Sequence, residues 1–300
     1  MPAPRSPTRD ALIAEATSAV EHALRSGDIA GAVALADGMV ELAPNEPTVL
    51  AARSRVLRAA GRTAEADAAE ADAIARVAAT LPPMDLQARM NHFARVTFLG
   101  GPAEHFVALG QMQLLTLLEE GLESHHRVLD VGCGALRAGL WLVKVLEAGH
   151  YFGIEPNRAR LAFGLEHVLG PDLVARRAPR FDTNDQFDLS VFGVRFDFIV
   201  ARSVWTHAAK RHIEAMLDGL VAHGDVLLTS VLPARTVAED YRGDTWVGQS
   251  DTSPFGGLVR HDRAWIDHAA STRGLRVRAL ERHVVNEQVW LRIERSPLPS

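Results

Sequence analysis

The sequence predicts an α/β protein in which a mostly parallel sheet of seven strands follows an all-α segment. Three observations predict this fold. From about Arg127 onward, short apolar runs alternate with amphipathic stretches, which is the order of strands and helices in a parallel sheet. A glycine loop follows the first of these runs. Between Ala11 and Thr80, by contrast, the chain is rich in alanine, almost free of aromatic residues and helical in period.

The first eighty residues are predicted to form pairs of helices. The run Gly27-Asp-Ile-Ala-Gly-Ala32 recurs as Gly61-Arg-Thr-Ala-Glu-Ala66, 34 residues later. Pro44 and Pro47 fall where one pair should end and the next begin, because proline does not continue a helix. This segment resembles tetratricopeptide (TPR) repeats, whose period is about 34 residues. Because such arrays usually need three or more repeats, we expect the two pairs to lean on the rest of the chain or on a second copy.

Two roles remain open for the TPR-like segment: a docking surface for a protein partner, or a plain helical cap that can also mediate self-association. Leu81-Pro-Pro83 interrupts the helical pattern and marks a linker. Met84–Leu99 and Ala103–Glu120 are then predicted to form two leading helices. On the second helix, Gly110 and Gln111 either line the site or only pack against neighbouring residues.

A nucleoside site is predicted where the sheet begins. Arg127–Val131 has the pattern of a short strand, and Gly132 and Gly134 open a tight turn after it. A helix leads to a second strand, His150–Ile154, which ends at Glu155, 21 residues beyond Gly134. Glycine lets the backbone pass close to a ligand, and an acid at this distance can accept both hydroxyls of a ribose.

The same loop does not fit a dinucleotide. A nicotinamide dehydrogenase needs a third glycine where Arg137 stands, and Gly139 comes two residues too late. Asp130, just before the first glycine, would repel a pyrophosphate but suits a cationic ligand with an ammonium group. An NAD-dependent enzyme is therefore the weaker hypothesis.

These residues carry a resemblance to a known family. Asp130-Val-Gly-Cys-Gly134 resembles motif I of the class I S-adenosylmethionine-dependent methyltransferases, and Ile154-Glu-Pro-Asn157 resembles their motif II. The resemblance spans about residues 127–295 and implies a Rossmann-like sheet that binds S-adenosyl-L-methionine (SAM). The cofactor-binding residues that it implies are Asp130, Gly132, Gly134 and Glu155. Arg137 either pairs with the cofactor carboxylate or stays in solvent.

Asn184 and Asp185 are predicted to hold the adenine ring. They lie in Phe181–Phe187, where the family has its third strand and a polar loop. Either side chain can accept a hydrogen bond from the exocyclic amine, while Phe181 or Phe187 can cover the ring. Asn and Asp are also common in turns, so a purely structural role is the alternative.

The acceptor is expected at the end of the fourth strand, Phe196–Ser203, because ligands bind outside the carboxyl ends of parallel strands. Arg202 and Ser203 stand at that end, and we assign both to the cofactor site. His207 follows and is the candidate catalytic base, since a free imidazole pKa of about 6.5 leaves the ring ready to accept a proton near neutral pH. A structural or solvent-exposed role for His207 is the alternative.

Missing residues narrow the substrate class. No Asn-Pro-Pro-Tyr or Asp-Pro-Pro-Tyr run follows the fourth strand, which counts against methylation of an adenine or glutamine amide nitrogen. Cys133, the only cysteine, lies in the cofactor loop, so a covalent cytosine-C5 mechanism lacks its nucleophile. O-methylation, or N-methylation of an amine, of a small molecule, glycan or natural product by in-line transfer remains. His212 and His261 are weaker candidates for the base.

The remaining strands complete the sheet. Gly224–Val231 is predicted to be the fifth strand, and Arg276–Leu280 with Gln288–Glu294 a terminal pair. Tyr241–His261 is rich in Gly, Asp, Ser and Thr and too long for a simple connection. It is either a lid over the acceptor or an ordered surface excursion.

Composition sets the outer limits of the interpretation. With 300 residues the chain has room for about two domains. A formal charge of −5 and a pI near 6.2 give no broad attraction to nucleic acid or an anionic membrane. A single cysteine excludes an intrachain disulfide framework and a cysteine-based zinc site, and we predict no metal site. No apolar run approaches the roughly 18 residues of a membrane span, and residues 1–10 do not have the pattern of a secretory signal, so we expect a cytoplasmic protein.

The predicted organisation has three parts: the TPR-like segment (residues 1–81), leading helices that cover the cofactor (residues 82–126) and the SAM-binding domain (residues 127–300). The rival hypothesis is a non-catalytic SAM-binding or scaffold protein that recruits a partner through the TPR-like helices. The complete set of cofactor residues around Asp130 and Glu155 argues that cofactor binding is retained.

Overall fold

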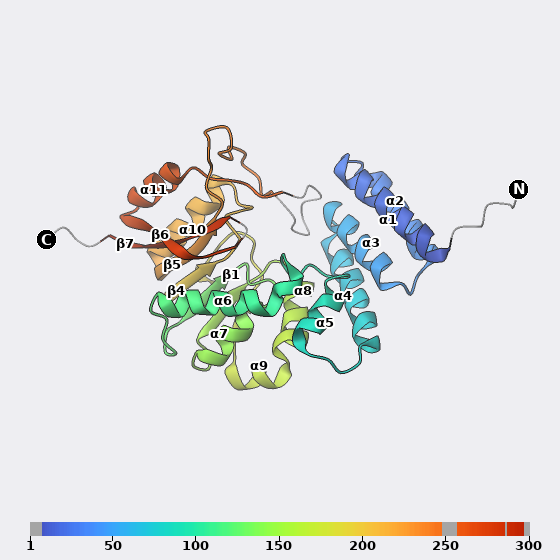
Figure 1. Ribbon diagram of the computed structural model, residues 1–300, viewed down its shortest axis with the longest axis horizontal. Helices are drawn as coiled ribbons and strands as arrows, with labels where there is room; N and C mark the ends of the chain where they lie inside the picture. Colours follow the sequence, from blue (N-terminus) through green and yellow to red (C-terminus); the bar gives the residue numbers. More distant parts are fainter. Residues whose placement is uncertain (1–7, 248–256, 286, 297–300) are drawn as a thin grey trace, which may run out of the picture. The chain divides into compact units, whose positions relative to one another are not determined.

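The computed structural model describes residues 8–247, 257–285 and 287–296 (Figure 1). The chain divides into two compact units, of which the first runs to Leu99 and the second continues from Gly100. Within the described ranges, no helix has the length and apolar character needed to cross a membrane.

The first unit is helical. Its helices are α1 (Arg9–Arg25), α2 (Ile29–Leu42), α3 (Pro47–Ala59), α4 (Thr63–Thr80) and α5 (Leu86–Phe93). Helix α1 packs on α2, α2 on α3, and α3 on α4. Gly27 and Gly61 stand in the turns after α1 and α3 with φ angles of 78° and 74°, a conformation that a Cβ atom disfavours. The 34-residue recurrence in the sequence thus coincides with two matching helix–turn–helix units.

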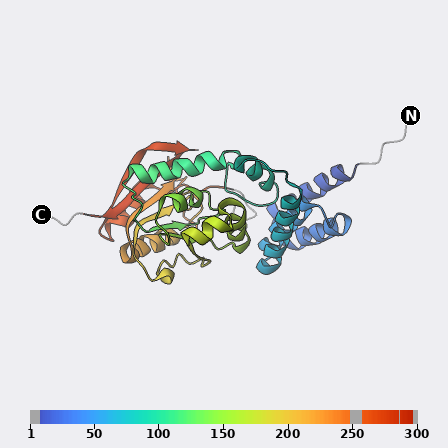
Figure 2. The same cartoon turned by 90° about the horizontal axis from the view of Figure 1, so that it is seen from below.

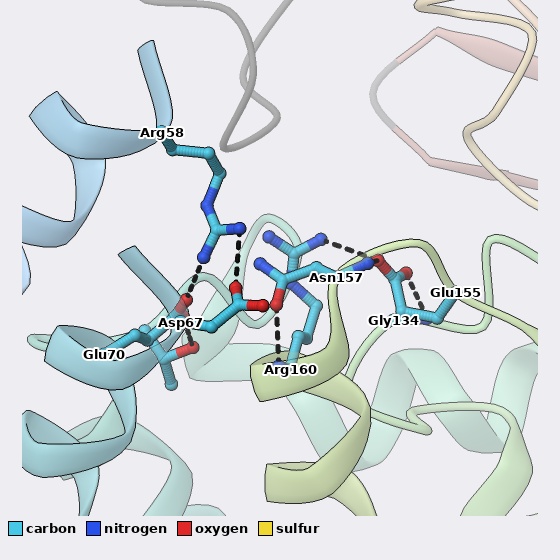
Figure 3. A network of polar contacts seen from close by, with 8 residues as sticks. Arg58, Asp67, Glu70, Gly134, Glu155, Asn157 and Arg160 are labelled. Atoms are coloured by element: carbon cyan, nitrogen blue, oxygen red, sulfur yellow. Dashed lines mark hydrogen bonds and ion pairs between the residues drawn. The ribbon is translucent and has the colours of Figure 1, made fainter. Parts of the chain in front are cut away.

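A buried ion pair joins α3 to α4 inside this unit. Arg58 Nη2 donates to Glu70 Oε2 at 2.9 Å, and its Nη1 lies 2.8 Å from Asp67 Oδ1 (Figure 3). Glu70 Oε1 accepts from Thr97 Oγ1 at 2.5 Å. The side chains of Arg58 and Glu70 are only 4% and 5% exposed, so each charge depends on the other for compensation.

The second unit is built on a seven-stranded sheet. Its strands are β1 (Val128–Val131), β2 (Tyr151–Ile154), β3 (Arg180–Asp182), β4 (Phe196–Ala201), β5 (Gly224–Val231), β6 (Leu275–Val285) and β7 (Gln288–Arg295). They lie in the order β3-β2-β1-β4-β5-β7-β6. Neighbours from β3 to β5 are parallel, whereas β7 runs antiparallel to both β5 and β6. The prediction of a Rossmann-like, mostly parallel sheet of seven strands is confirmed.

Helices cover both faces of this sheet. They are η1 (Ala103–His105), α6 (Phe106–Glu119), α7 (Gly139–Val145), α8 (Arg158–Phe163), the π-helix η2 (Gly164–Leu169), α9 (Pro171–Arg177), η3 (Ser190–Phe192), α10 (Lys210–His223) and α11 (Arg263–Ser271). Figure 1 shows α6, α7 and α9 on one side of the strands and α10 and α11 on the other. Buried side chains of α10 and α11 form one apolar cluster with β1, β4 and β5. Figure 2 shows α6 running alongside the β6 end of the sheet, where the two elements are in contact.

One predicted helix is shorter in the structure. The helix expected over Met84–Leu99 covers only α5, since the chain tightens into short turns after Phe93 and reaches Gly100 in a positive-φ conformation. After β2, the helix that begins at Arg158 changes from α to π geometry at Gly164, where a Cβ atom would lie 2.9 Å from the Leu136 side chain.

The predicted excursion Tyr241–His261 is described at its two ends only. Residues 248–256 lie outside the described residues, and with them the proposed lid. Gly110, on the leading helix α6, has a packing role. A Cβ atom there would lie 2.3 Å from the Arg137 carbonyl oxygen, so glycine allows α6 to approach the start of α7 closely.

Candidate functional site

The glycine loop follows the carboxyl end of β1, as predicted. Gly132 and Gly134 have φ angles of 69° and 57°, which favour glycine. A Cβ atom on Gly132 would lie 2.9 Å from Val204 Cγ2, in the loop after β4. The loops after two neighbouring strands therefore come into contact at the edge of the sheet where a ligand is expected.

Asp130 is a buried carboxyl group beside this loop. It is 4% exposed, and its Oδ2 accepts a hydrogen bond from Tyr151 Oη at 2.8 Å. Burial raises the pKa of Asp130 to about 7; the Tyr151 hydrogen bond opposes this shift and the charge of Glu155 adds to it. Gly139 makes room for the phenol, since a Cβ atom there would lie 2.7 Å from Tyr151 Oη. A cationic ligand would therefore favour ionisation of a carboxyl group that is close to half protonated at neutral pH.

Glu155 follows β2 and is fixed to the glycine loop. Its Oε2 accepts from the Gly134 amide at 3.0 Å and its Oε1 from the Asn157 amide at 2.9 Å (Figure 3). Arg160 Nη1 lies 3.4 Å from Oε1. Because a carboxylate oxygen has about two lone pairs, Oε2 keeps one for a ligand hydroxyl. The sequence interpretation did not assign roles to Asn157 and Arg160, although an Asn directly before a helix is a recognisable cap.

Asn184 and Asp185 lie after β3, at the same edge of the sheet. Asn184 Nδ2 donates to Asp182 Oδ1 at 2.7 Å, and Asn184 Oδ1 accepts from the Asp188 amide at 3.0 Å. Asp185 is exposed and accepts from Gln186 Nε2 at 2.7 Å. The side-chain amide of Asn184 thus stabilises the turn in which it lies. An adenine-binding role for Asn184 or Asp185 stays a prediction.

A polar network closes the carboxyl end of β4. Ser203 has a φ of 59°, which is uncommon for a residue other than glycine. Its amide donates to Ser230 Oγ at 2.8 Å, and its Oγ accepts from Gln288 Nε2 at 3.1 Å. Arg202 Nη1 donates to Ser230 Oγ at 2.9 Å and also to Gln288 Oε1. Backbone strain held by such a network is typical of functional sites, and Gln288 is a member that the sequence did not indicate.

Two partly buried guanidinium groups, those of Arg137 and Arg202, lie at this edge of the sheet. Arg137 donates to the Gly100 and Gly101 carbonyl oxygens at 2.5 and 3.1 Å, and it lies over the Phe106 ring at 5.2 Å. Burial lowers the pKa of Arg137 and of Arg202 to about 10, and for Arg202 the positive charge of Arg137 adds to the effect. Partly desolvated neighbouring cations make this part of the edge favourable for anions.

His207 is held by backbone groups. Its Nδ1 lies 3.0 Å from the Val247 carbonyl oxygen, and the ring also bonds the backbone of Gly257. The Trp246 ring stacks on the imidazole with 5.7 Å between centroids. Burial lowers the pKa of His207, and the two backbone bonds partly oppose the shift. A ring nitrogen would have to leave a carbonyl before it could accept a proton from a ligand.

The two weaker candidates have structural contacts. His212 Nδ1 accepts from the Ala209 amide at 3.0 Å at the start of α10. His261 is fully buried, and its Nε2 lies 3.1 Å from the Trp205 carbonyl oxygen and 3.0 Å from that of Ala208. His261 thus fixes the loop after β4, and His212 forms a helix cap.

A cavity of about 360 Å³ lies at the opposite edge of the sheet. Its lining residues stand at or before the amino ends of strands: His125, Arg127, His150, Arg195, Phe196, Asp197 and Asp225. Ligands of open parallel sheets bind at the carboxyl ends. This cavity is therefore separate from the site around Asp130 and Glu155.

No family model matches the sequence, and no curated protein matches it significantly. Solved structures with a similar fold include magnesium protoporphyrin IX methyltransferase from Synechocystis PCC 6803 with bound SAM, at 17% identity and a TM-score of 0.48, covering 72% of this chain and 100% of that one. The N-terminal domain of EvdMO1 with bound S-adenosylhomocysteine (SAH) is 15% identical with a TM-score of 0.49, and the match covers 66% of this chain and 86% of that one. A putative O-methyltransferase from Nostoc punctiforme PCC 73102 is 11% identical with a TM-score of 0.49, and the match covers 69% of this chain and 60% of that one. Similarities this low do not indicate a substrate.

Proposed function

We propose that the protein is a SAM-dependent methyltransferase that methylates a hydroxyl, or an amine, of a small-molecule acceptor by in-line transfer. The observation that carries this proposal is the Glu155 carboxylate, which the amides of Gly134 and Asn157 fix beside the glycine loop. In that position its Oε2 can accept a hydrogen bond from a ribose hydroxyl of the cofactor, while the loop passes close to the ligand.

The other residues fit the same cofactor. Asp130 offers a buried carboxyl group to a cationic amino group, and Arg137 offers its guanidinium to a carboxylate. Gly132 has no Cβ atom, which would clash with the Val204 side chain, so its backbone stays uncovered beside the ligand site. Asn184 or Asp185 accepts a hydrogen bond from the adenine amine. Bound SAM supplies an already activated methyl group, so the protein has to position the acceptor and accept a proton.

We assign proton acceptance to His207. Its Nδ1 lies 3.0 Å from the Val247 carbonyl oxygen, so in the neutral ring Nδ1 carries the hydrogen and Nε2 keeps the lone pair. A pKa lowered by burial keeps that lone pair available at neutral pH. In this assignment the ring releases its contact with Gly257 when the acceptor binds.

The cofactor assignment is tested by isothermal titration with SAM, SAH and NADH. We expect SAM and SAH to bind and NADH not to bind. Glu155→Gln removes charge-assisted bonds worth about 1.5–3 kcal/mol, so the Kd for SAM should rise about 10- to 150-fold. Glu166→Gln is the matched control, because the Glu166 side chain is 75% exposed on η2. Equal SAM affinity in the two variants, or binding of NADH alone, would refute the assignment.

We further propose that α1–α4 are a TPR-like segment that binds a protein partner or a second copy of the chain. The support is the pair of turns at Gly27 and Gly61, 34 residues apart, with the same backbone conformation. Sedimentation of the full chain tests self-association, and a monomer at every accessible concentration would contradict it. Under the rival scaffold function, SAM binds but no hydroxyl or amine acceptor is methylated.

A further inference from the structure

Three arginine side chains in the described residues bind a carboxylate through the Nε–Nη2 edge of the guanidinium group. Three exposed pairs use Nε and Nη2 together: Arg62 with Glu65 at 2.7 and 2.7 Å, Arg76 with Asp72 at 2.9 and 3.1 Å, and Arg273 with Asp218 at 2.6 and 3.2 Å. This edge presents two parallel N–H groups that match the two oxygens of a carboxylate.

Arg202 has the same edge, but its partners are all on the other side of the guanidinium. Nη1 donates to Ser230 Oγ and Gln288 Oε1, and the group lies over the Trp290 ring at 5.5 Å. Within residues 8–247, 257–285 and 287–296, no acceptor contacts Arg202 Nε or Nη2 and no acid pairs with Arg202. Neither nitrogen is among the fully buried polar atoms without a partner in the described residues, so each keeps some exposure to solvent.

The fold keeps this guanidinium in place without a ligand. Ser230 and Gln288 lie on β5 and β7 and are 0% and 5% exposed, so the anchoring groups are rigid. Both anchors are neutral, and the nearby Arg137 adds a second positive charge, which together with burial lowers the pKa of Arg202. Because the partners of Arg202 are neutral and the charge of Arg137 acts on it, an anion bound to Arg202 would stabilise its positive charge.

The position of Arg202 favours the acceptor over the cofactor as the source of that anion. Glu155 follows β2 and the glycine loop follows β1, whereas Arg202 follows β4 and is anchored on β5 and β7. A cofactor with its ribose at Glu155 and its amino acid at the β1 loop leaves the ends of β4 and β5 for the acceptor.

We propose that Arg202 binds a carboxylate of the methyl acceptor through Nε and Nη2, so that the acceptor is a hydroxy acid or an amino acid. The proposal rests on the proposed methyltransferase function. Ser230 and Gln288 act as positioning residues, because they hold Nη1 and orient the guanidinium.

The test is a titration of the full-length protein, saturated with SAH, with the hydroxy acids 4-hydroxybenzoate, salicylate and glycolate, with the amino acids glycine and 4-aminobenzoate, and with the corresponding amides. We expect at least one carboxylate to bind tenfold or more tightly than its amide. Arg202→Gln should remove this preference, while Arg202→Lys should keep part of it, because lysine retains the charge but not the bidentate edge. Arg158→Gln, a change at an exposed arginine on α8, should leave the preference unchanged.

A second titration identifies the source of the carboxylate. 5′-Methylthioadenosine lacks the amino-acid carboxylate that SAH carries. If Arg202→Gln weakens SAH binding and leaves 5′-methylthioadenosine binding unchanged, Arg202 binds the cofactor and the acceptor proposal is wrong. Equal binding of carboxylates and amides, carboxylate binding that survives Arg202→Gln, or no carboxylate binding at all also overturns it. Failure of SAH to bind the unmodified protein refutes the methyltransferase function instead, and the same titrations without SAH then test Arg202 alone.

Discussion

Replacing Asp130 with asparagine tests whether this carboxyl group faces the cofactor ammonium. Burial raises the Asp130 pKa to about 7, so at pH 6 about 0.9 of the molecules carry the proton before cofactor binds, and at pH 7 about half do. An ammonium group beside Asp130 favours the ionised form. Binding should therefore release about 0.9 proton at pH 6 and about 0.5 at pH 7, and SAM affinity should rise about fivefold between these two values.

The assay is isothermal titration with SAH in pairs of buffers that differ in ionisation enthalpy. The slope of the observed enthalpy against buffer enthalpy gives the number of protons released. Asp130→Asn keeps a side-chain oxygen for the Tyr151 hydroxyl but has no titrating proton. The variant should bind SAH without proton release. A wild-type protein that releases no proton at pH 6, or a variant that releases as many, would refute the role of Asp130.

The same shift has a consequence for stability. The Asp130 pKa is higher in the folded state than in the unfolded chain, so the folded state holds the proton between pH 4 and 7 and the unfolded state does not. This contribution is fully present below about pH 4 and is lost as pH rises to about 7. Across that window, the wild type should lose up to about 4 kcal/mol relative to Asp130→Asn in urea unfolding. A difference between the two proteins that does not change with pH would contradict the shifted pKa.

Three further perturbations test other parts of the chain. His207→Ala should lower kcat for any accepted acceptor by about 100-fold or more with SAM affinity unchanged, and a wild-type rate would exclude His207 as the base. Glu70→Gln should lower the free energy of unfolding of the helical unit by about 3 kcal/mol in urea, because it leaves Arg58 without the charge of Glu70. The exposed Glu65→Gln should lower it by less than about 1 kcal/mol, and equal effects would contradict the buried ion pair. Gly61→Ala should cost about 1–2 kcal/mol because Gly61 has a φ of 74°, whereas Gly38→Ala, inside α2 with open space around it, should be neutral or stabilising; the reverse order would contradict the turn geometry.

Local sequence patterns were sufficient for the sheet and for the meeting of the glycine loop with Glu155. A strand, two glycines and an acid 21 residues later determine where Gly134 and Glu155 meet, and their hydrogen bond forms at that point. Each of these features depends on residues close together in the chain, so the spacing alone predicts it. The partner of Asp130 was beyond this reasoning, because Tyr151 points to it from a neighbouring strand and Gly139 makes room for it only in the folded chain.

Side-chain roles were harder to predict where one residue type serves two purposes. Asn184 was expected to bind adenine, and its amide group makes three hydrogen bonds within its own loop. His207 was the candidate base, with a structural role as the alternative, and the sequence did not indicate that the backbone carbonyl of Val247 contacts its Nδ1. The sequence shows which side chains can donate and accept hydrogen bonds. Their partners depend on how the loops fold, which the local sequence does not determine.

The polar network at the end of β4 is assembled from distant segments, so its contacts became visible only in the fold. Gln288 lies 85 residues from Ser203 and Ser230 lies 28 residues from Arg202, yet these side chains share one network because β4, β5 and β7 are neighbours in the sheet. The sequence placed Arg202 at the end of a strand and assigned it to the cofactor. The contacts of Arg202 in the fold all involve Nη1, and this arrangement is the basis for our proposal that Arg202 binds the acceptor instead of the cofactor.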